Sequence, residues 1–465
     1  MADGNITKDM IYEAVSPDDF ESMLDLDRYN ARSTAFDKII TATHDHFWDP
    51  LDKAYIDFDE PFDMENQALL PEEMIGALQT KYVSEALSDP KERIRFINAQ
   101  TLRSFSSILH GEQGALNLSA SLCHVLYDQG AQEYAANQTR EEARHVTAFA
   151  KYIKARWGRP AACSPVLQGL LVEIISAPEV YKKIIGMQML VEGLAMGAFA
   201  TFFQKLNDPL GRKLMQLVMT DEAFHHKFGK IWADRTIPKL TPEEHIIIED
   251  WAAHCFQTLL FNLVAPSEQR DLYEEFGLDP DRVVAEFAEI ATDQARREDM
   301  KEATNIFRVL IKTLLNAGII TDRTRSFYGM YVDMDELKAE GDRMVGDDIA
   351  DEGIAYLKTI NFRDRPFAMK IAAVEQQRLG AVGGPVLDQV ALGLGELRDR
   401  AVGPDLPELV VEGLVGHHQL EQLLGHRVAV VAVAVGEGAH GQALHQHLHA
   451  DDLLVDLRRL DDLDQ

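Results

Sequence analysis

Two Glu-x-x-His motifs stand 80 residues apart in this chain (142 to 222), and a single glutamate precedes each by 30 residues (112 to 142, 192 to 222). Glutamate and histidine three positions apart share one helix face, so each motif could offer two ligands to one metal centre. Four carboxylates and two imidazoles in this order form the ligand set of a carboxylate-bridged dinuclear metal site in a four-helix bundle. The six candidate ligands are Glu112, Glu142, His145, Glu192, Glu222 and His225.

The residues between these ligands have the composition of helix ends where antiparallel helices would need them. The midpoint between 112 and 142 falls at Tyr127-Asp128-Gln129-Gly130, a good helix stop. The midpoint between 192 and 222 falls at Asn207-Asp208-Pro209, a stop followed by a capped helix start with proline at its first position. Each ligand is then about 15 residues, or roughly 22 Å, from its turn. All four ligand segments would therefore meet at the same height in the bundle.

The surroundings of the ligands separate a metal site from a solvated helix face. A lone Glu-x-x-His motif is common on exposed helices, but Glu112 and Glu192 stand inside apolar helical stripes. Burying an unpaired charge costs several kcal/mol, and a pair of dications would offset that cost. Between the two halves, residues 158–178 contain three prolines, which predicts a long crossover connection rather than a tight turn.

Two five-residue segments carry a resemblance to a known family. Glu141-Glu142-Ala143-Arg144-His145 and Asp221-Glu222-Ala223-Phe224-His225 resemble the paired motifs of the ferritin-like di-iron oxidoreductases. That superfamily includes acyl carrier protein desaturases, bacterial multicomponent monooxygenase hydroxylases and ribonucleotide reductase small subunits. The resemblance covers about residues 95–235. It implies two iron ions, with Glu142 and Glu222 as bridging carboxylates and the other four candidates as terminal ligands.

The resemblance also implies a second layer of contacts around the ligands. The acid before each motif glutamate would accept a hydrogen bond from the histidine of the other half. Glu141 would thus orient His225, and Asp221 would orient His145.

Three positions depart from the patterns of individual members. Phe149 stands where radical-storing reductase subunits have tyrosine, and Ala195 and Met196 stand where hydroxylases and desaturases have threonine. These residues predict an apolar pocket on the oxygen side of the metals. His226 faces about 100° away from His225 on the helix, so we expect it to contact a ligand residue or to lie at the surface, and not to bind metal itself.

Composition bounds the remaining classes of function. A net charge of −30 argues against nucleic acid and anionic membrane partners. Cys123, Cys163 and Cys255 are too few and scattered for a disulfide framework or a thiolate metal site, so we expect a cytoplasmic protein. The start lacks a signal peptide pattern, and no run reaches the roughly 18 apolar residues of a membrane span.

We expect four segments along the chain. Residues 1–90 form an acidic N-terminal arm, 91–240 the di-metal four-helix bundle, and 241–371 further helices that pack on it. In the arm, His44-Asp45-His46 could indicate a metal site, but the flanking Trp48 and Pro50 favour a packing role. After the bundle, we expect helices from Pro242 through Val264 and from Pro280 through Arg297.

Residues 372–465 have a different composition from the rest of the chain. They use only ten residue types, all with codons that begin with G or C, and they lack lysine, serine, threonine and aromatic residues. This pattern favours an out-of-frame or disordered tail over a genuine low-complexity tail. We therefore give its histidines no functional weight.

Together these observations predict an all-α, ferritin-like enzyme with flanking helices. Two irons would activate dioxygen and hydroxylate, desaturate or N-oxygenate a small apolar organic substrate. Electrons would come from an external reductase or ferredoxin, because the chain has no flavin or nicotinamide fingerprint and no cysteine cluster. Two alternatives stay open: a ligand-binding oxidase with a manganese–iron or di-iron centre, and a ferritin-type ferroxidase. We also expect a homodimer.

Overall fold

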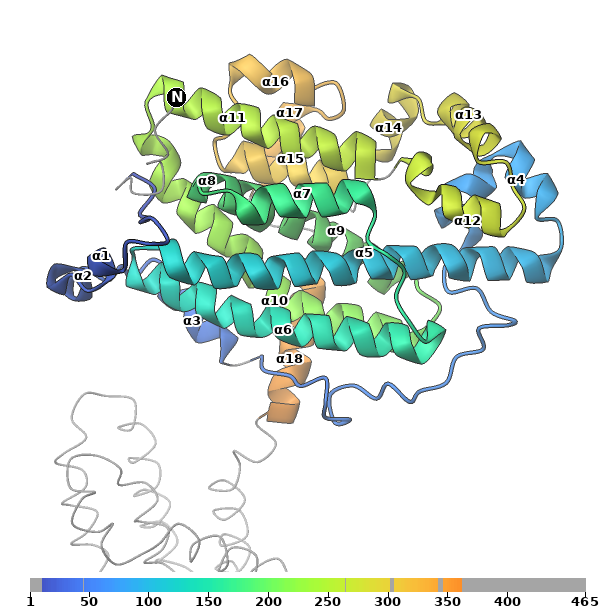
Figure 1. The fold of residues 1–465 in the computed structure, drawn as a ribbon, viewed down its shortest axis with the longest axis horizontal. Coiled ribbons are helices and arrows are strands. Elements are labelled where there is room, and N and C mark those ends of the chain that lie inside the picture. Colours follow the sequence, from blue (N-terminus) through green and yellow to red (C-terminus); the bar gives the residue numbers. More distant parts are fainter. Residues whose placement is uncertain (1–10, 45, 264, 302–304, 342–345, 362–465) are drawn as a thin grey trace, which may run out of the picture. The chain divides into compact units, whose positions relative to one another are not determined.

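Figure 1 shows the computed structural model of the chain, which describes residues 11–361 apart from residues 45, 264, 302–304 and 342–345. Within these ranges the secondary structure is helical, and the one β-type contact is an antiparallel bridge between Ala14 and Leu126. The all-α prediction is confirmed for this part of the chain. The predicted tail, residues 372–465, lies outside the described residues.

The helices fall into three consecutive stretches. The N-terminal stretch has α1 (Phe20–Met23), α2 (Leu26–Asn30), α3 (Asp37–Thr43), η2 (Glu72–Met74), η3 (Gly76–Gln79) and α4 (Lys81–Ala86). The central stretch has α5 (Pro90–Val125), α6 (Gln129–Trp157), α7 (Pro165–Ser176), α8 (Val180–Lys183), η4 (Ile184–Val191), α9 (Glu192–Lys205) and α10 (Pro209–Thr236). The last stretch has η5 (Ile237–Lys239), α11 (Pro242–Gln257), η6 (Thr258–Leu263), η7 (Pro266–Gln269), α12 (Arg270–Glu275), α13 (Pro280–Ile290), α14 (Asp293–Asp299), α15 (Ile306–Asn316), α16 (Asp322–Tyr328), α17 (Met334–Ala339) and α18 (Asp347–Asn361).

Both predicted turns lie where the ligand spacing places them. Asp128 caps α6 by accepting hydrogen bonds from the backbone amides of Gly130 and Ala131. Asp208 caps α10, whose first residue is Pro209. An aspartate cap accepts hydrogen bonds from amides that have no partner within the helix. Proline at the first position costs no helical hydrogen bond, because an amide there would have no partner within the helix. These two caps set the register of the helix pairs α5–α6 and α9–α10.

The connection between the two pairs is helical in part. The helix α6 ends at Gly158, whose φ of 85° is a left-handed conformation that glycine adopts without strain. The predicted crossover, residues 158–178, then contains α7, which Ser164 caps and Pro165 begins. Before Glu192 the chain forms the π-helix η4, which the helical spacing did not predict. Isolated π-helical turns are frequently found at functional sites.

Two hydrophobic clusters fill the interior, and the candidate ligands lie between them. The helix α5 packs along α6, α9 packs along α10, and α10 also contacts α6. Along α5, one cluster ends at Leu109 and the other begins at Ala115, on either side of Glu112. Along α6, one cluster ends at Ala135 and the other begins at Ala148, on either side of the first motif. The motifs therefore form a polar layer inside an apolar core.

Helices from the last stretch cover the central ones. The helix α15 packs on α9, where a side chain on Gly197 would lie 3.0 Å from Cα of Ile306. The helix α18 packs on α10, where Gly353 leaves room for Thr220. The single helix expected from Pro280 through Arg297 is wrong in detail: α13 ends at Ile290 and α14 starts at Asp293, because Thr292 caps a new helix.

The segment Val180–Lys205 is long and apolar enough, by length and composition, to cross a membrane. It passes on average hydropathy, although Gln188 and Glu192 interrupt it, so that an unbroken run of about 18 apolar residues is absent there as expected. In the fold 72% of its most apolar window is buried, as in the core helix of a soluble protein.

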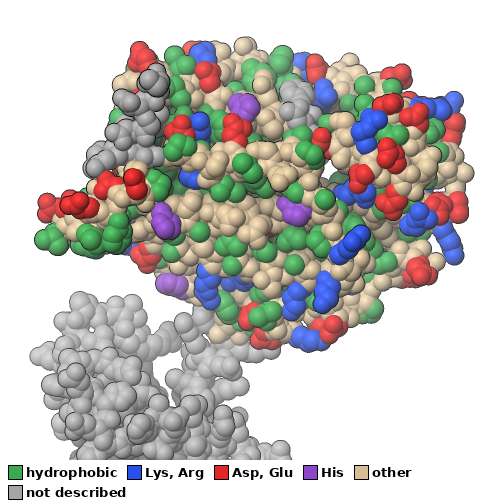
Figure 2. Space-filling model, in the orientation of Figure 1, with side chains coloured by type: hydrophobic (Ala, Val, Ile, Leu, Met, Phe, Trp, Pro, Cys, Tyr) green, Lys and Arg blue, Asp and Glu red, His purple; other side chains and the backbone are tan. Residues whose placement is uncertain are grey.

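The face shown in Figure 2 carries acidic and basic side chains side by side.

Candidate metal centre

The structure brings all six candidate ligands together in the interior. They come from four helices: Glu112 from α5, the first motif from α6, Glu192 from α9 and the second motif from α10. None of the six is more than 5% exposed. Their ligand atoms form two groups, each with all atoms within 4.8 Å of one another. The His145 group contains Glu112, Glu142, His145 and Glu222, and the His225 group contains Glu142, Glu192, Glu222 and His225.

Glu142 and Glu222 belong to both groups and divide their oxygens between them. Glu142 places Oε2 3.4 Å from His145 Nδ1 and Oε1 3.0 Å from His225 Nδ1. Glu222 places Oε1 3.2 Å from His145 Nδ1 and Oε2 3.1 Å from His225 Nδ1. Each carboxylate thus presents one oxygen to each histidine. This arrangement suits two bridging carboxylates between two ions.

The chemistry of the donor set fits a pair of metal ions. The atoms Glu142 Oε2 and Glu222 Oε1 are buried and accept no hydrogen bond from the described residues. A buried carboxylate oxygen without a partner is costly, and a bound cation would compensate it. Four carboxylates also balance the charge of two divalent ions, and carboxylate with imidazole suits iron or manganese.

Both predicted second-layer contacts are present. Asp221 Oδ2 lies 2.8 Å from His145 Nε2, and Glu141 Oε2 lies 2.9 Å from His225 Nε2. A carboxylate only accepts, so each Nε2 donates a proton to it, and each Nδ1 faces the ligand group. The acid beside each motif glutamate therefore orients the imidazole of the opposite motif.

The protonation of the site follows from burial and from the charges within it. Burial raises the pKa of Glu112 and of Glu192 well above the usual glutamate value. Burial lowers the pKa of the two histidines, but Glu112 beside His145 and Glu222 beside His225 outweigh it and raise both values. The site without metal therefore retains protons that metal ions would displace.

The bridging glutamates and Asp221 behave in the opposite way. Burial raises the pKa of Glu142 and Glu222, but the neighbouring His225 ring outweighs it, so both lie below the usual value. At Asp221 burial is outweighed by Arg144, and the pKa is well below the usual range. These three groups are ionised at neutral pH.

No known protein family, curated protein or solved structure matches the chain. The evidence for a function therefore comes from the site itself.

The N-terminal arm contributes residues that the motif analysis did not include. Trp48 Nε1 donates to Asp221 Oδ2 at 2.9 Å, and His46 Nε2 lies 3.2 Å from Asp221 Oδ1. Both side chains are at most 1% exposed, whereas His44 is exposed. The arm therefore packs against the site, where Trp48 and His46 contact Asp221. Arg144 completes the cluster, since it donates to Asp221 Oδ2 at 2.7 Å and to the carbonyl oxygen of Trp48 at 3.1 Å.

Two buried glutamines precede ligand glutamates on their helices. Gln138 Nε2 donates to Glu142 at 3.1 Å and to Glu192 at 3.0 Å. Gln188, in η4, has both polar side-chain atoms buried without a hydrogen-bond partner among the described residues. Each glutamine stands four residues before a ligand glutamate and therefore shares its helix face. This spacing could have pointed to both glutamines from the sequence.

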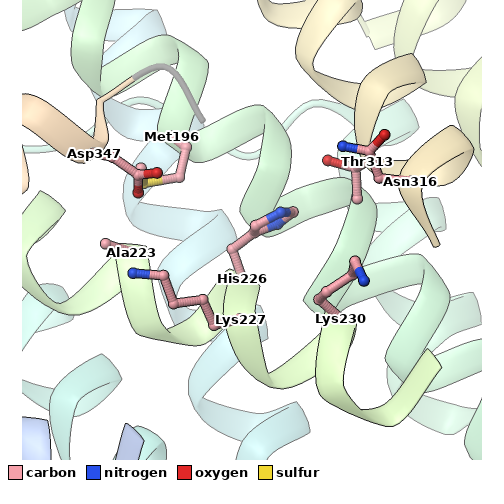
Figure 3. Close-up of a pocket in the computed structure, with 8 residues that line it drawn as sticks. All are labelled: Met196, Ala223, His226, Lys227, Lys230, Thr313, Asn316 and Asp347. Carbon is pink, nitrogen blue, oxygen red and sulfur yellow. The ribbon is translucent and has the colours of Figure 1, made fainter. Parts of the chain in front are cut away.

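The three residues expected to line one apolar pocket belong to one hydrophobic cluster or pack against it. Phe149 and Met196 are both buried in this cluster, and the Phe149 ring lies 5.8 Å from the Phe199 ring. Ala195 is half-buried against the same cluster. Met196 lines a cavity with His226 that Phe149 and Ala195 do not line (Figure 3). His226 is 9% exposed, and burial lowers its pKa to about 4, so its ring is neutral.

Proposed function

We propose that the chain is a ferritin-like di-iron oxidoreductase that uses dioxygen to hydroxylate, desaturate or N-oxygenate a small organic substrate. The observation that carries this proposal is the sharing of Glu142 and Glu222 between two buried ligand groups. The helices α5, α6, α9 and α10 would be the four helices of the bundle, and α7 would lie in its crossover connection.

The bound ions would supply the redox chemistry that reduces dioxygen. The residues of the chain would hold and orient them. Asp221 and Glu141 keep protons on His145 Nε2 and His225 Nε2, so that each Nδ1 lone pair is available. Gln138 fixes a bridging and a terminal carboxylate by donating to both. The hydrophobic clusters on either side would exclude water from the reaction.

The proposed reaction needs electrons from outside the chain. In a hydroxylation, one oxygen atom of dioxygen enters the substrate and the other leaves as water, with two electrons and two protons from a donor. The three cysteines, Cys123, Cys163 and Cys255, are free thiols in the structure, and the sequence has no flavin or nicotinamide fingerprint. A separate reductase or ferredoxin would therefore supply the electrons.

A second candidate is an oxidase that holds a ligand at a manganese–iron or di-iron pair. The buried Phe149 and Met196 favour it, because they replace the tyrosine and threonine of other members and keep the core near the ligands apolar. This candidate shares the ligand set and differs in the metal pair and in a retained ligand.

Metal analysis of the purified full chain, with an optical spectrum after oxygen exposure of the reduced protein, tests the proposal. We expect two metal ions per chain and an oxygen-dependent absorption change. Glu142→Gln should lose both ions, because Glu142 is proposed to hold each of them. Glu133→Gln is the matched control on α6, since Glu133 is half-exposed in a surface ion pair with Arg32. Two ions retained by Glu142→Gln would refute the bridging role.

A further inference from the structure

A cavity of about 120 Å³ lies beside the candidate metal centre, among α9, α10, α15 and the first residue of α18 (Figure 3). Its apolar wall is formed by Met196 and Ala223. Met196 follows Glu192 by one helical turn, and Ala223 directly follows Glu222. A cavity of about 150 Å³ is large enough to hold benzene. The present cavity is somewhat smaller but is open to solvent at the exposed Lys227, so it suits at most a molecule with a single ring or a short chain, part of which reaches solvent.

His226 is a buried polar group with an unused hydrogen-bonding atom in this cavity. Its side chain is 9% exposed, and Nδ1 has no partner among the described residues. Figure 3 shows the imidazole in the middle of the lining residues, between Lys227 and Thr313. Leaving such a buried group unpaired is unfavourable. A ligand with a hydrogen-bonding head group would satisfy it.

The lining residues provide cations for an anionic head group. Lys227 is exposed, which opens the cavity to solvent, and its ammonium lies 4.8 Å from the Phe224 ring. Among the described residues no carboxylate forms an ion pair with Lys227. Lys230 supplies a second ammonium, which Asp234 shares at 2.6 Å. Asp347 is the acidic residue of the lining and lies on the side of Ala223 in Figure 3, so an anion should bind at the central His226, between Lys227 and Lys230.

We propose that this cavity binds a small organic acid, with its carboxylate at Lys227 and His226 and its apolar end against Met196 and Ala223. The inference deepens the proposed function, because it names the substrate class. The binding step itself does not require metal.

Calorimetric titration of the full chain, with and without iron, tests this proposal. The probes are benzoate and hexanoate, each compared with its neutral amide, benzamide or hexanamide. We expect at least one acid to bind more tightly than its amide. Lys227→Met should weaken that binding roughly tenfold to a hundredfold, because a charge-assisted contact is lost. Lys154→Met, at an exposed position of α6, removes the same charge elsewhere and should leave the affinity unchanged.

The outcomes separate this proposal from the proposed function. The cavity proposal is overturned if neither acid binds, if the amides bind as tightly, or if Lys227→Met binds normally. Acid binding that depends on Lys227 in a chain that holds no iron would support the cavity and overturn the di-iron function. Iron binding without acid binding would overturn the cavity proposal and leave the di-iron function standing.

Discussion

The two halves of the site use the same ligand spacing but surround it differently. The His145 half rests on Asp221, which also contacts Trp48, Arg144 and His46. The His225 half rests on Glu141, which also lies 4.0 Å from His46. A repeated spacing of ligands thus fixes where the metals would bind, and the neighbouring segments decide how each half behaves.

The helices that carry the terminal glutamates differ as well. Glu112 lies within the regular helix α5, whereas Glu192 begins α9 directly after the π-helix η4. Gln138 donates to Glu192, and His145 Nδ1 lies 3.2 Å from Glu112. The two metal positions should therefore be chemically inequivalent, although their ligand types are the same. The predictions below test this difference.

The largest expected effect is the loss of one ion from one half. Glu112→Gln should leave about one metal per chain, held by the His225 group, and Glu192→Gln should leave about one held by the His145 group. Each variant removes one terminal carboxylate from one group only. Metal analysis of both variants decides the matter. If either variant keeps both ions, or loses both, the division of the site into two groups is wrong.

The next effect compares the two orienting acids. Asp221→Asn should weaken metal loading by about 10 to 100-fold, the usual cost of losing a contact that orients a ligand. Glu141→Gln should have a smaller effect, because fewer buried groups depend on Glu141. Competitive titration with a chelator measures both. Equal effects would show that the additional contacts of Asp221 do not matter.

The metal-free protein should lose stability as pH rises. The two histidines have raised pKa values, so their contribution is complete below the ordinary value of 6.5 and is lost as pH rises through the folded value. The raised pKa of the terminal glutamates, Glu112 and Glu192, acts in the same direction. The lowered pKa values of Glu142 and Asp221 affect stability only at acid pH, where these carboxylates become protonated.

We therefore expect the melting temperature of the metal-free chain to fall between about pH 6 and about pH 8. Metal ions replace the protons, so the iron-loaded chain should show a smaller change over this range. Thermal denaturation with and without a chelator provides the comparison. A metal-free chain that becomes more stable over this range would contradict the retention of protons in the site.

The smallest expected effect concerns the N-terminal arm. Trp48→Phe removes one hydrogen bond to Asp221 and keeps an aromatic ring beside His145. A lost hydrogen bond of this kind costs about 1 kcal/mol, or roughly fivefold in metal affinity. Trp157→Phe is a control, since Trp157 donates to a backbone oxygen outside the site. An unchanged affinity for Trp48→Phe would limit the arm to packing.

The sequence predicted the parts of this site that depend on helical repeat and capping. The spacing of the motifs placed the turns at Asp128 and Asp208, since an aspartate cap is a local signal. It also paired each histidine with the acid of the other half, through the family resemblance. The π-helix before Glu192 was not predicted, because its extra residue per turn leaves no clear mark in an apolar run.

The residues that arrive from distant segments could not be placed from spacing alone. Trp48 and His46 reach Asp221 across more than 170 residues of sequence, and no periodicity connects them. The cavity at His226 depends on α15. This helix packs closely on α9 because Gly193 and Gly197 of α9 have no side chains. Such contacts depend on tertiary packing, whereas the ligand set depends on positions within single helices.

The most direct test of the di-metal site is anomalous X-ray scattering from crystals of the iron-loaded full chain. The account predicts two peaks among the helices α5, α6, α9 and α10. One should be bound by Glu112 and His145, the other by Glu192 and His225, with Glu142 and Glu222 bound to both. A single peak, or two peaks that share neither carboxylate, would contradict it.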